Sequence, residues 1–108
     1  MADPTRQSQP GHHGSDLRAS ELDDLLRQSA LGDATAFGTL YDRTVVRFFG
    51  LALAVLGDHG HAEETTRTAY AQIWARSRQF DRAQHGSLSW MTTIVYELAR
   101  TARTPGTA

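Results

Sequence analysis

The side chains of this sequence that could do chemistry gather around positions 59–64. His59 and His61 stand two residues apart at a turn, and Glu63 and Glu64 follow them. Imidazole and carboxylate groups bind metals, but this spacing matches no standard zinc site, so we interpret the group as a solvated turn. The two glutamates could also serve as a general acid and a general base. Adjacent helical residues point about 100° apart, however, so the pair does not share a pocket.

No other catalytic arrangement occurs along the 108 residues. Without cysteine the chain has no disulfide, no thiolate nucleophile and no thiolate metal site. It also lacks Gly-x-Ser-x-Gly, a glycine-rich phosphate loop and His-Glu-x-x-His. His12 and His13 lie in a polar segment over residues 1–18, which predicts a disordered tail rather than a metal site. The sequence therefore predicts a protein that is not an enzyme and has no cofactor and no metal.

Charge is distributed unevenly along the chain. Residues 1–66 hold five arginines and ten acids, a net charge of −5, whereas residues 67–108 hold six arginines and two acids, a net charge of +4. Every basic residue is arginine, which suits phosphate contacts and base stacking, although the codon usage of a GC-rich genome explains the same bias. No apolar run approaches the roughly 18 residues of a membrane span, and no secretory signal opens the chain. We therefore expect a cytoplasmic protein with no membrane partner.

Apolar residues that recur at steps of three or four predict four helices, two of them in the first half of the chain. The first begins at Ser20, with Asp23 as an imperfect capping box, and ends at Gly32. The second covers residues 34–56 and is capped by Asp33. The residues expected to face the core from these helices are Leu22, Leu25, Leu26, Ser29 or Ala30, Phe37, Leu40, Tyr41, Val45, Phe48, Ala52 and Val55.

The second half predicts a turn, a third helix over about 61–78, a loop over 80–86 and a fourth helix over about 88–102 that Ser87 caps. Glu63 and Glu64 are expected in the first turn of the third helix, near the positive end of its dipole. The residues expected to be buried are Ala62, Thr66, Ala69, Tyr70, Ile73, Trp74, Trp90, Met91, Ile94, Val95 and Leu98.

Four helices with short connections predict an all-α fold, a compact helical bundle with no strand. A chain of 108 residues suits a single domain. We expect that domain to cover residues 19–104, between the disordered tail over 1–18 and a flexible tail over 105–108.

Three stretches of the sequence, in this order and at this separation, resemble domain 2 (region 2) of sigma-70 type transcription initiation factors of the extracytoplasmic-function group. Residues 32–42, GDATAFGTLYD, are similar to the family's opening pattern of Gly-Asp, Ala-Phe and Leu-Tyr. Residues 62–81 begin with Ala-Glu-Glu, carry Tyr70, Ile73 and Trp74, and end in Phe-Asp. Residues 86–94, GSLSWMTTI, resemble the Gly-Ser-x-x-Trp-Leu-x-x-Ile start of the promoter-reading helix.

The resemblance implies two interaction surfaces. The third helix would dock on the clamp helices of the RNA polymerase β′ subunit, through Glu63, Glu64, Arg67, Thr68, Gln72 and Arg78. The loop and the fourth helix would contact the promoter −10 element, where a base of the melted strand is flipped into a pocket. The expected DNA-binding residues are Asp81, Gln84, His85 and Ser87 for the edge of that base, Arg82, Arg100 and Arg103 for phosphates, and Tyr96 for stacking.

Several positions depart from the family's pattern. Arg67 and Thr68 replace the usual Gln-Glu of the docking helix, and Glu97 and Thr101 interrupt the fourth helix, which is usually rich in arginine. The second helical domain, which reads the −35 element, does not follow in these residues, so both a truncated factor and a single-domain relative fit the sequence. The leading hypothesis is a sigma-like protein that docks on polymerase and contacts DNA. The alternatives are an interaction module that binds polymerase or an anti-sigma partner without reading DNA, and a helical bundle of unrelated function.

Overall fold

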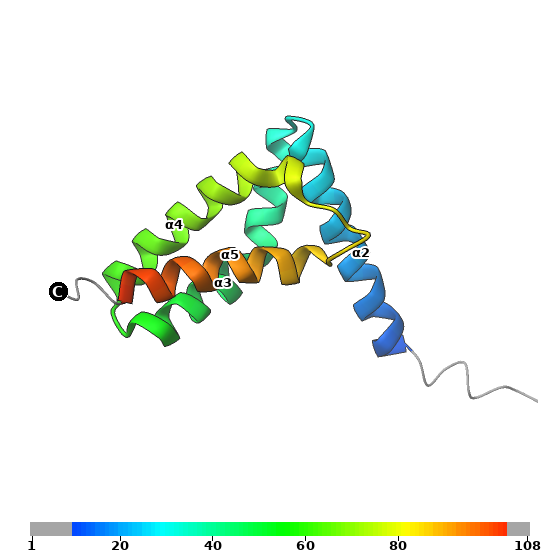
Figure 1. The fold of residues 1–108 in the computed structure, drawn as a ribbon. Coiled ribbons are helices and arrows are strands. Elements are labelled where there is room, and N and C mark those ends of the chain that lie inside the picture. The colour runs from blue at the N-terminus through cyan, green and yellow to red at the C-terminus, as the bar shows by residue number, and fades with distance from the viewer. Residues whose placement is uncertain (1–9, 104–108) are drawn as a thin grey trace, which may run out of the picture.

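The computed structural model describes residues 10–103, with side chains from Arg18 onward. In order, the described residues form α2 (Pro10–Ala30), α3 (Ala34–Leu56), α4 (His59–Arg76), the short 3-10 helix η1 (Ser77–Gln79) and α5 (Ser87–Arg103). No strand occurs in this range, which confirms the predicted all-α class. α3 packs against each of the other three α-helices. α4 and α5 converge where α4 begins and α5 ends, and they diverge toward α2 (Figure 1).

The first helix starts earlier than the sequence predicts. α2 begins at Pro10 rather than at Ser20, and proline is well suited to a first turn because its missing N–H has no partner there. Ser20 and Asp23 therefore lie inside the helix and form no capping box. The backbone is helical over residues 10–18, where a tail was expected. The remaining parts of the two predicted tails, residues 1–9 and 105–108, lie outside the described residues, as does Thr104 at the end of the predicted domain.

α3 has the bounds that the sequence predicts, because local signals fix both of its ends. The carboxylate of Asp33 accepts a hydrogen bond from the Ala36 amide at 3.0 Å. At the other end Gly57 adopts a φ of 70°, and its amide donates to the Leu53 carbonyl at 2.8 Å. This left-handed conformation favours glycine, which has no Cβ to clash with the backbone.

α4 is displaced toward the N-terminus relative to its predicted range. Asp58 caps the helix, since its carboxylate accepts a hydrogen bond from the His61 amide at 2.8 Å. With a start at His59, Glu63 and Glu64 lie in the second turn and the first turn holds no acid, so the predicted dipole stabilisation of that turn was wrong. The helix ends at Arg76, and the chain continues as η1 where a further α-helical turn was expected.

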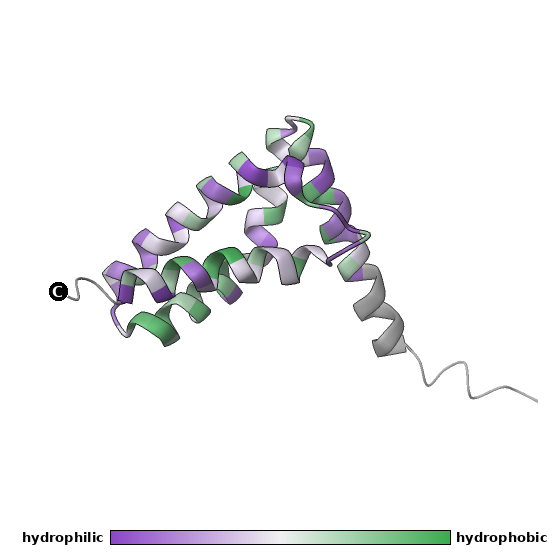
Figure 2. Cartoon of the chain, viewed as in Figure 1, coloured by the Kyte–Doolittle hydropathy of each residue, from purple (hydrophilic) through white to green (hydrophobic). Residues whose placement is uncertain are grey.

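The core lies where the four helices meet, and the predicted apolar stripes supply most of it. The central cluster consists of Leu22, Leu26, Leu40, Phe48, Ala69, Tyr70, Ile73, Met91, Ile94 and Val95. Trp90 is partly buried against this cluster, as expected for a core residue. Figure 2 shows that hydrophobic residues concentrate on α3 and α5, while α4 is largely hydrophilic. α4 therefore presents a polar outer surface.

Two aromatic residues predicted to be buried lie at the edge of the core instead. Trp74 is 39% exposed and Tyr41 is 41% exposed. Each ring packs edge-on against a neighbour: Trp74 against Phe37, with centroids 5.1 Å apart, and Tyr41 against Tyr70, with centroids 4.7 Å apart. A large ring can thus contribute to packing through one edge while its other face stays at the surface.

A polar pair that was not expected from the sequence lies inside the core. Thr44 is buried, its hydroxyl donates to the Leu40 carbonyl at 2.8 Å, and it also shares a hydrogen bond with the Tyr70 hydroxyl. Burial raises the pKa of Tyr70 to about 12; the hydrogen bond with Thr44 acts in the opposite direction, and nearby Tyr41 adds to the rise. The neutral phenol is therefore the form that the folded protein holds.

Candidate functional site

The predicted docking residues of α4 lie on its outer face. Ala62, Thr65, Thr66, Ala69, Tyr70 and Ile73 are the buried residues of this helix. Glu63, Glu64, Arg67 and Thr68 are exposed and lie one turn apart, so they form one continuous surface. Gln72 continues this surface; it is half-buried and accepts a weak hydrogen bond from Arg76 at 3.4 Å. We call Glu63, Glu64, Arg67, Thr68 and Gln72 the α4 face.

Arg78, the sixth predicted docking residue, lies apart from the α4 face. It belongs to η1, and its Nε donates to the carbonyl of Ala30 at 3.4 Å. A cation beside the last carbonyls of α2 is favoured by the dipole of that helix. Arg78 therefore tethers η1 to the C-terminal end of α2, although its side chain remains exposed.

A shallow groove separates the start of α4 from the end of α5. Its volume is about 400 Å³, and its lining residues are His61, Glu64, Thr65, Thr68, Leu98, Thr101 and Ala102. Two residues of the α4 face, Glu64 and Thr68, form one wall of this groove. The α4 face is therefore continuous with the C-terminal half of α5.

The backbone of the 80–86 loop is organised by Asp81. Its carboxylate accepts a hydrogen bond from the Ala83 amide at 3.0 Å, and its carbonyl accepts from the amides of Gln84 at 2.9 Å and His85 at 3.1 Å. These bonds close a tight turn and leave the side chains of Gln84 and His85 exposed. Of the four residues predicted to contact a flipped base, Asp81, Gln84 and His85 are thus brought together at the surface.

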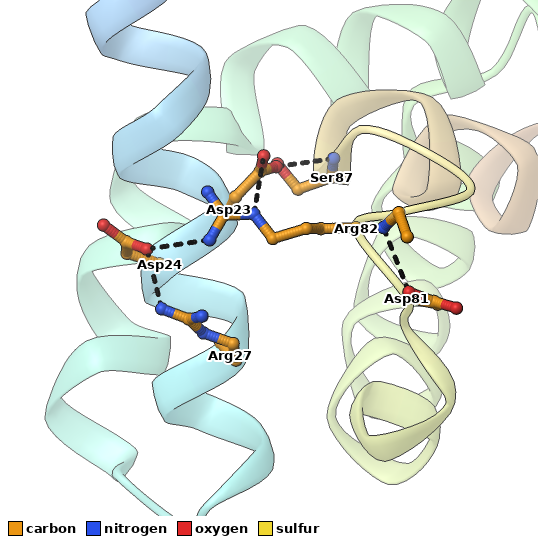
Figure 3. A network of polar contacts seen from close by, with 7 residues as sticks. Asp23, Asp24, Arg27, Asp81, Arg82 and Ser87 are labelled. Atoms are coloured by element: carbon orange, nitrogen blue, oxygen red, sulfur yellow. Dashed lines mark hydrogen bonds and ion pairs between the residues drawn. The ribbon is translucent and has the colours of Figure 1, made fainter.

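Ser87, the fourth of them, lies inside the protein. It is 2% exposed and is the first residue of α5, not the residue that caps it. Its amide donates to the carboxylate of Asp23 in α2 at 2.8 Å (Figure 3). The helix start is therefore stabilised by an acid from another helix, which satisfies a buried amide and suits the positive end of the α5 dipole.

Arg82 extends from the loop toward α2 rather than toward open solvent. Its Nε lies 3.8 Å from Asp23 Oδ2, and its Nη1 lies 3.5 Å from Asp24 Oδ1 (Figure 3). Asp24 also pairs with Arg27 at 2.9 Å. Neither Asp23 nor Asp24 was predicted to belong to the site; the signal that could have found them is a pair of adjacent acids in an otherwise amphipathic helix.

The remaining predicted DNA residues follow one side of α5. Tyr96, Arg100 and Arg103 recur at steps of four and three and are all exposed. The guanidinium of Arg100 lies 6.0 Å from the centroid of the Tyr96 ring, within reach of a cation–π contact. Arg100 also pairs with Glu97, with Nη2 and Oε1 3.4 Å apart. We call Tyr96, Arg100 and Arg103 the α5 stripe.

Two further features bear on the class of protein. Within the part of the chain that the structure describes, no three His, Cys, Asp or Glu residues gather as a metal site would require. None of the helices described is long and apolar enough to cross a membrane.

Four helices in this order, with a polar face on α4 and an organised loop before α5, are the architecture that the resemblance to a sigma-type domain predicts.

Comparisons with known proteins agree with this class. No family model matches the chain. It is 43% identical over 83 residues to the ECF RNA polymerase sigma factor SigK of Mycolicibacterium vanbaalenii, an alignment that covers 77% of this chain and 42% of the relative. The corresponding figures are 41% over 81 residues for SigK of Mycobacterium tuberculosis (75% and 43%) and 38% over 82 residues for SigK of Mycobacterium ulcerans (76% and 44%).

The chain is thus a homologue of the extracytoplasmic-function sigma factors of the sigma-70 family, which confirms the resemblance predicted from its motifs. It spans less than half of the length of the curated relatives that it matches.

Proposed function

We propose that the chain acts in the cytoplasm as a sigma-factor-like transcription initiation protein. In this proposal the α4 face docks on the β′ clamp helices of core RNA polymerase, and the loop and the α5 stripe contact the promoter −10 element. An anti-sigma factor is a further proposed partner, and no catalytic residue or cofactor takes part. The observation that carries the proposal is the identity of 38–43% to proteins named as ECF sigma factors, over about three quarters of the chain.

The exposure of the α4 face supports its proposed role in docking. Arg67 and Thr68 lie at its centre, where the family usually carries Gln-Glu, so the surface has one cation more and one acid fewer than is usual. Restoring Gln and Glu with Arg67→Gln and Thr68→Glu should therefore strengthen capture of core polymerase by the purified protein. The matched control is Val46→Glu with Arg47→Gln, which makes the same charge change at two exposed positions of α3. An equal gain from both pairs would count against docking through α4.

The α5 stripe supports the proposed contact with a single strand. Arg100 and Arg103 are exposed, so in this proposal they contact phosphates, and the exposed ring of Tyr96 offers a surface on which an unpaired base can stack. Gln84 and His85 present polar groups at the loop, where the edge of an extruded base could be bound. The proposal therefore places phosphate contacts along the helix and base contacts at its start.

Salt dependence tests the phosphate contacts. The complex of the protein with core polymerase should bind a −10-like single strand, and the affinity should fall steeply as salt rises. Replacing Arg100 and Arg103 by Ala should reduce the slope of log affinity against log salt by roughly 0.7 for each phosphate that is no longer neutralised. Arg43→Ala with Arg47→Ala removes the same charge from α3 and should leave the slope nearly unchanged. Equal slopes for all three proteins would refute the assignment.

A second candidate function is an interaction module that binds polymerase or an anti-sigma partner without reading DNA. The observation that favours it is that two of the three arginines predicted for phosphates already face carboxylates: Arg100 faces Glu97, and Arg82 faces the acids of α2. In the same experiment this candidate predicts that core polymerase is captured while no DNA is retained. If neither polymerase nor DNA is bound, both candidate functions fail.

A further inference from the structure

The 80–86 loop is joined to α2 by two adjacent acids. Asp23 accepts the hydrogen bond from the Ser87 amide and faces Arg82 with its second oxygen, while Asp24 faces Arg82 and Arg27 together. The side chain of Asp23 is only 16% exposed, whereas that of Arg82 is 39% exposed. The loop is thus held near its start by ion pairs and at its end by a partly buried hydrogen bond, both to the same helix (Figure 3).

This arrangement conflicts with a phosphate contact through Arg82. A phosphate that approached its guanidinium would also approach the carboxylates of Asp23 and Asp24, and like charges repel at this range. Freeing the arginine would in addition release the loop from α2. The geometry therefore favours a role in which Arg82 holds the loop and leaves the nucleic acid to other side chains.

We propose that Arg82 and Asp24, together with Asp23, are positioning residues: they hold the loop so that Gln84 and His85 present their side chains to the melted −10 strand. This inference rests on the proposed function, because it assigns the α2 acids to the DNA-reading site. It also means that acids of α2, which would repel DNA if they acted alone, promote its binding.

Neutralising Asp24 separates the two roles by the sign of the effect. If Arg82 bound phosphate, Asp24→Asn would free it and strengthen binding of a −10-like single strand to the complex with core polymerase. If Arg82 is a positioning residue, Asp24→Asn should weaken binding roughly two- to fivefold, the scale of an exposed ion pair. The matched control is Glu21→Gln, which neutralises another acid of α2 that is paired with Arg43 at 2.6 Å, away from the loop. Stronger binding by the Asp24 variant than by the Glu21 variant would overturn the inference.

Two variants of Arg82 complete the test. Arg82→Ala should weaken binding without changing its salt slope. Adding Asp24→Asn to Arg82→Ala should have little further effect, because the loss of Arg82 already removes both of its ion pairs with α2. Arg82→Lys keeps the charge but not the planar fork that faces two carboxylates, so it should behave like the alanine variant. Full rescue by lysine, or a salt slope reduced by the equivalent of about one phosphate in the alanine variant, would show a phosphate ligand instead.

Amide hydrogen exchange of the protein alone keeps the inference testable if no DNA is bound. The amides of Gln84, His85 and Ser87 are hydrogen-bonded in the loop and at the helix start. In Arg82→Ala and in Asp24→Asn they should exchange several times faster than in the wild-type protein, while amides in the middle of α3 keep their protection and show that the variants are folded. Unchanged exchange at these amides would refute the positioning role, whereas faster exchange without DNA binding would refute only the proposed function.

Discussion

The buried hydroxyl of Tyr70 makes stability depend on pH in the alkaline range. Tyr70 is 5% exposed, and its pKa is raised from 10.0 to about 12, chiefly by burial. As pH rises, the unfolded chain therefore releases the phenolic proton before the folded protein does. The contribution of the neutral phenol to the free energy of unfolding is complete below pH 10 and is lost as pH rises from 10 to 12. A pKa difference of this size corresponds to about 2.7 kcal/mol of unfolding free energy that disappears across this window.

Replacing Tyr70 by Phe isolates this effect. At pH 7 the variant lacks the hydrogen bond to Thr44 and should be less stable by about 1 kcal/mol. It has no proton to release, however, so its unfolding free energy should fall less above pH 10. The two stability curves should then cross at roughly pH 10.5–11, above which the Phe variant is the more stable protein.

Urea unfolding between pH 7 and pH 12, followed by circular dichroism, measures both curves. The other tyrosines and the arginines are common to both proteins, so the difference between the curves reports Tyr70 alone. Parallel curves from pH 9 to pH 12 would show that Tyr70 titrates alike in the folded and unfolded states. Burial would then not be what sets the pKa of Tyr70.

Three further predictions concern stability, each read as the urea midpoint at neutral pH. Asp23→Ala removes the acceptor of the Ser87 amide and should lower the free energy of unfolding by about 2 kcal/mol. Asp23→Asn keeps an acceptor and should lower it by less than half as much. Equal losses of stability in the two variants would show that the charge alone matters. Phe48→Ala empties a fully buried position and should cost roughly 3–5 kcal/mol, and a loss below about 1 kcal/mol would contradict the packing described. Gly57→Ala should destabilise the protein by about 1 kcal/mol, because the φ of Gly57 is 70°. Gly50 lies exposed inside α3 with no atom near a new Cβ, so Gly50→Ala should stabilise the protein by roughly 0.5–1 kcal/mol. A Gly57 variant more stable than the Gly50 variant would refute this difference in backbone conformation.

The sequence predicts the parts of the fold that local signals determine. α3 matches its predicted range because Asp33 and Gly57 are adjacent to its ends and act on the nearest backbone groups. α4 starts earlier than predicted because Asp58 caps it where only a turn was expected. The apolar stripes locate most of the core because the spacing of residues along a helix sets which side chains share a face.

Features that depend on tertiary contacts could not be predicted in this way. Thr44 is polar, and its burial is acceptable only because the Leu40 carbonyl and the Tyr70 hydroxyl satisfy its hydrogen bonds. Asp23 accepts a hydrogen bond from the Ser87 amide, and Asp23 and Asp24 both pair with Arg82. These contacts depend on the 80–86 loop and the start of α5, which come much later in the chain. Most of the predicted site residues in the loop and α5 are exposed, as expected. The exceptions depend on α2: Ser87 is buried, and Arg82 is paired with acids of that helix.

The hydrogen bond between Asp23 and the Ser87 amide joins residues 64 positions apart. Such a contact forms only after the intervening chain has closed on itself, with the entropic penalty of a long loop. During synthesis α2, α3 and α4 leave the ribosome first, so the carboxylate is in place before the helix that it caps has emerged. The order of translation thus supplies the acceptor in α2 before the Ser87 amide that donates to it at the start of α5.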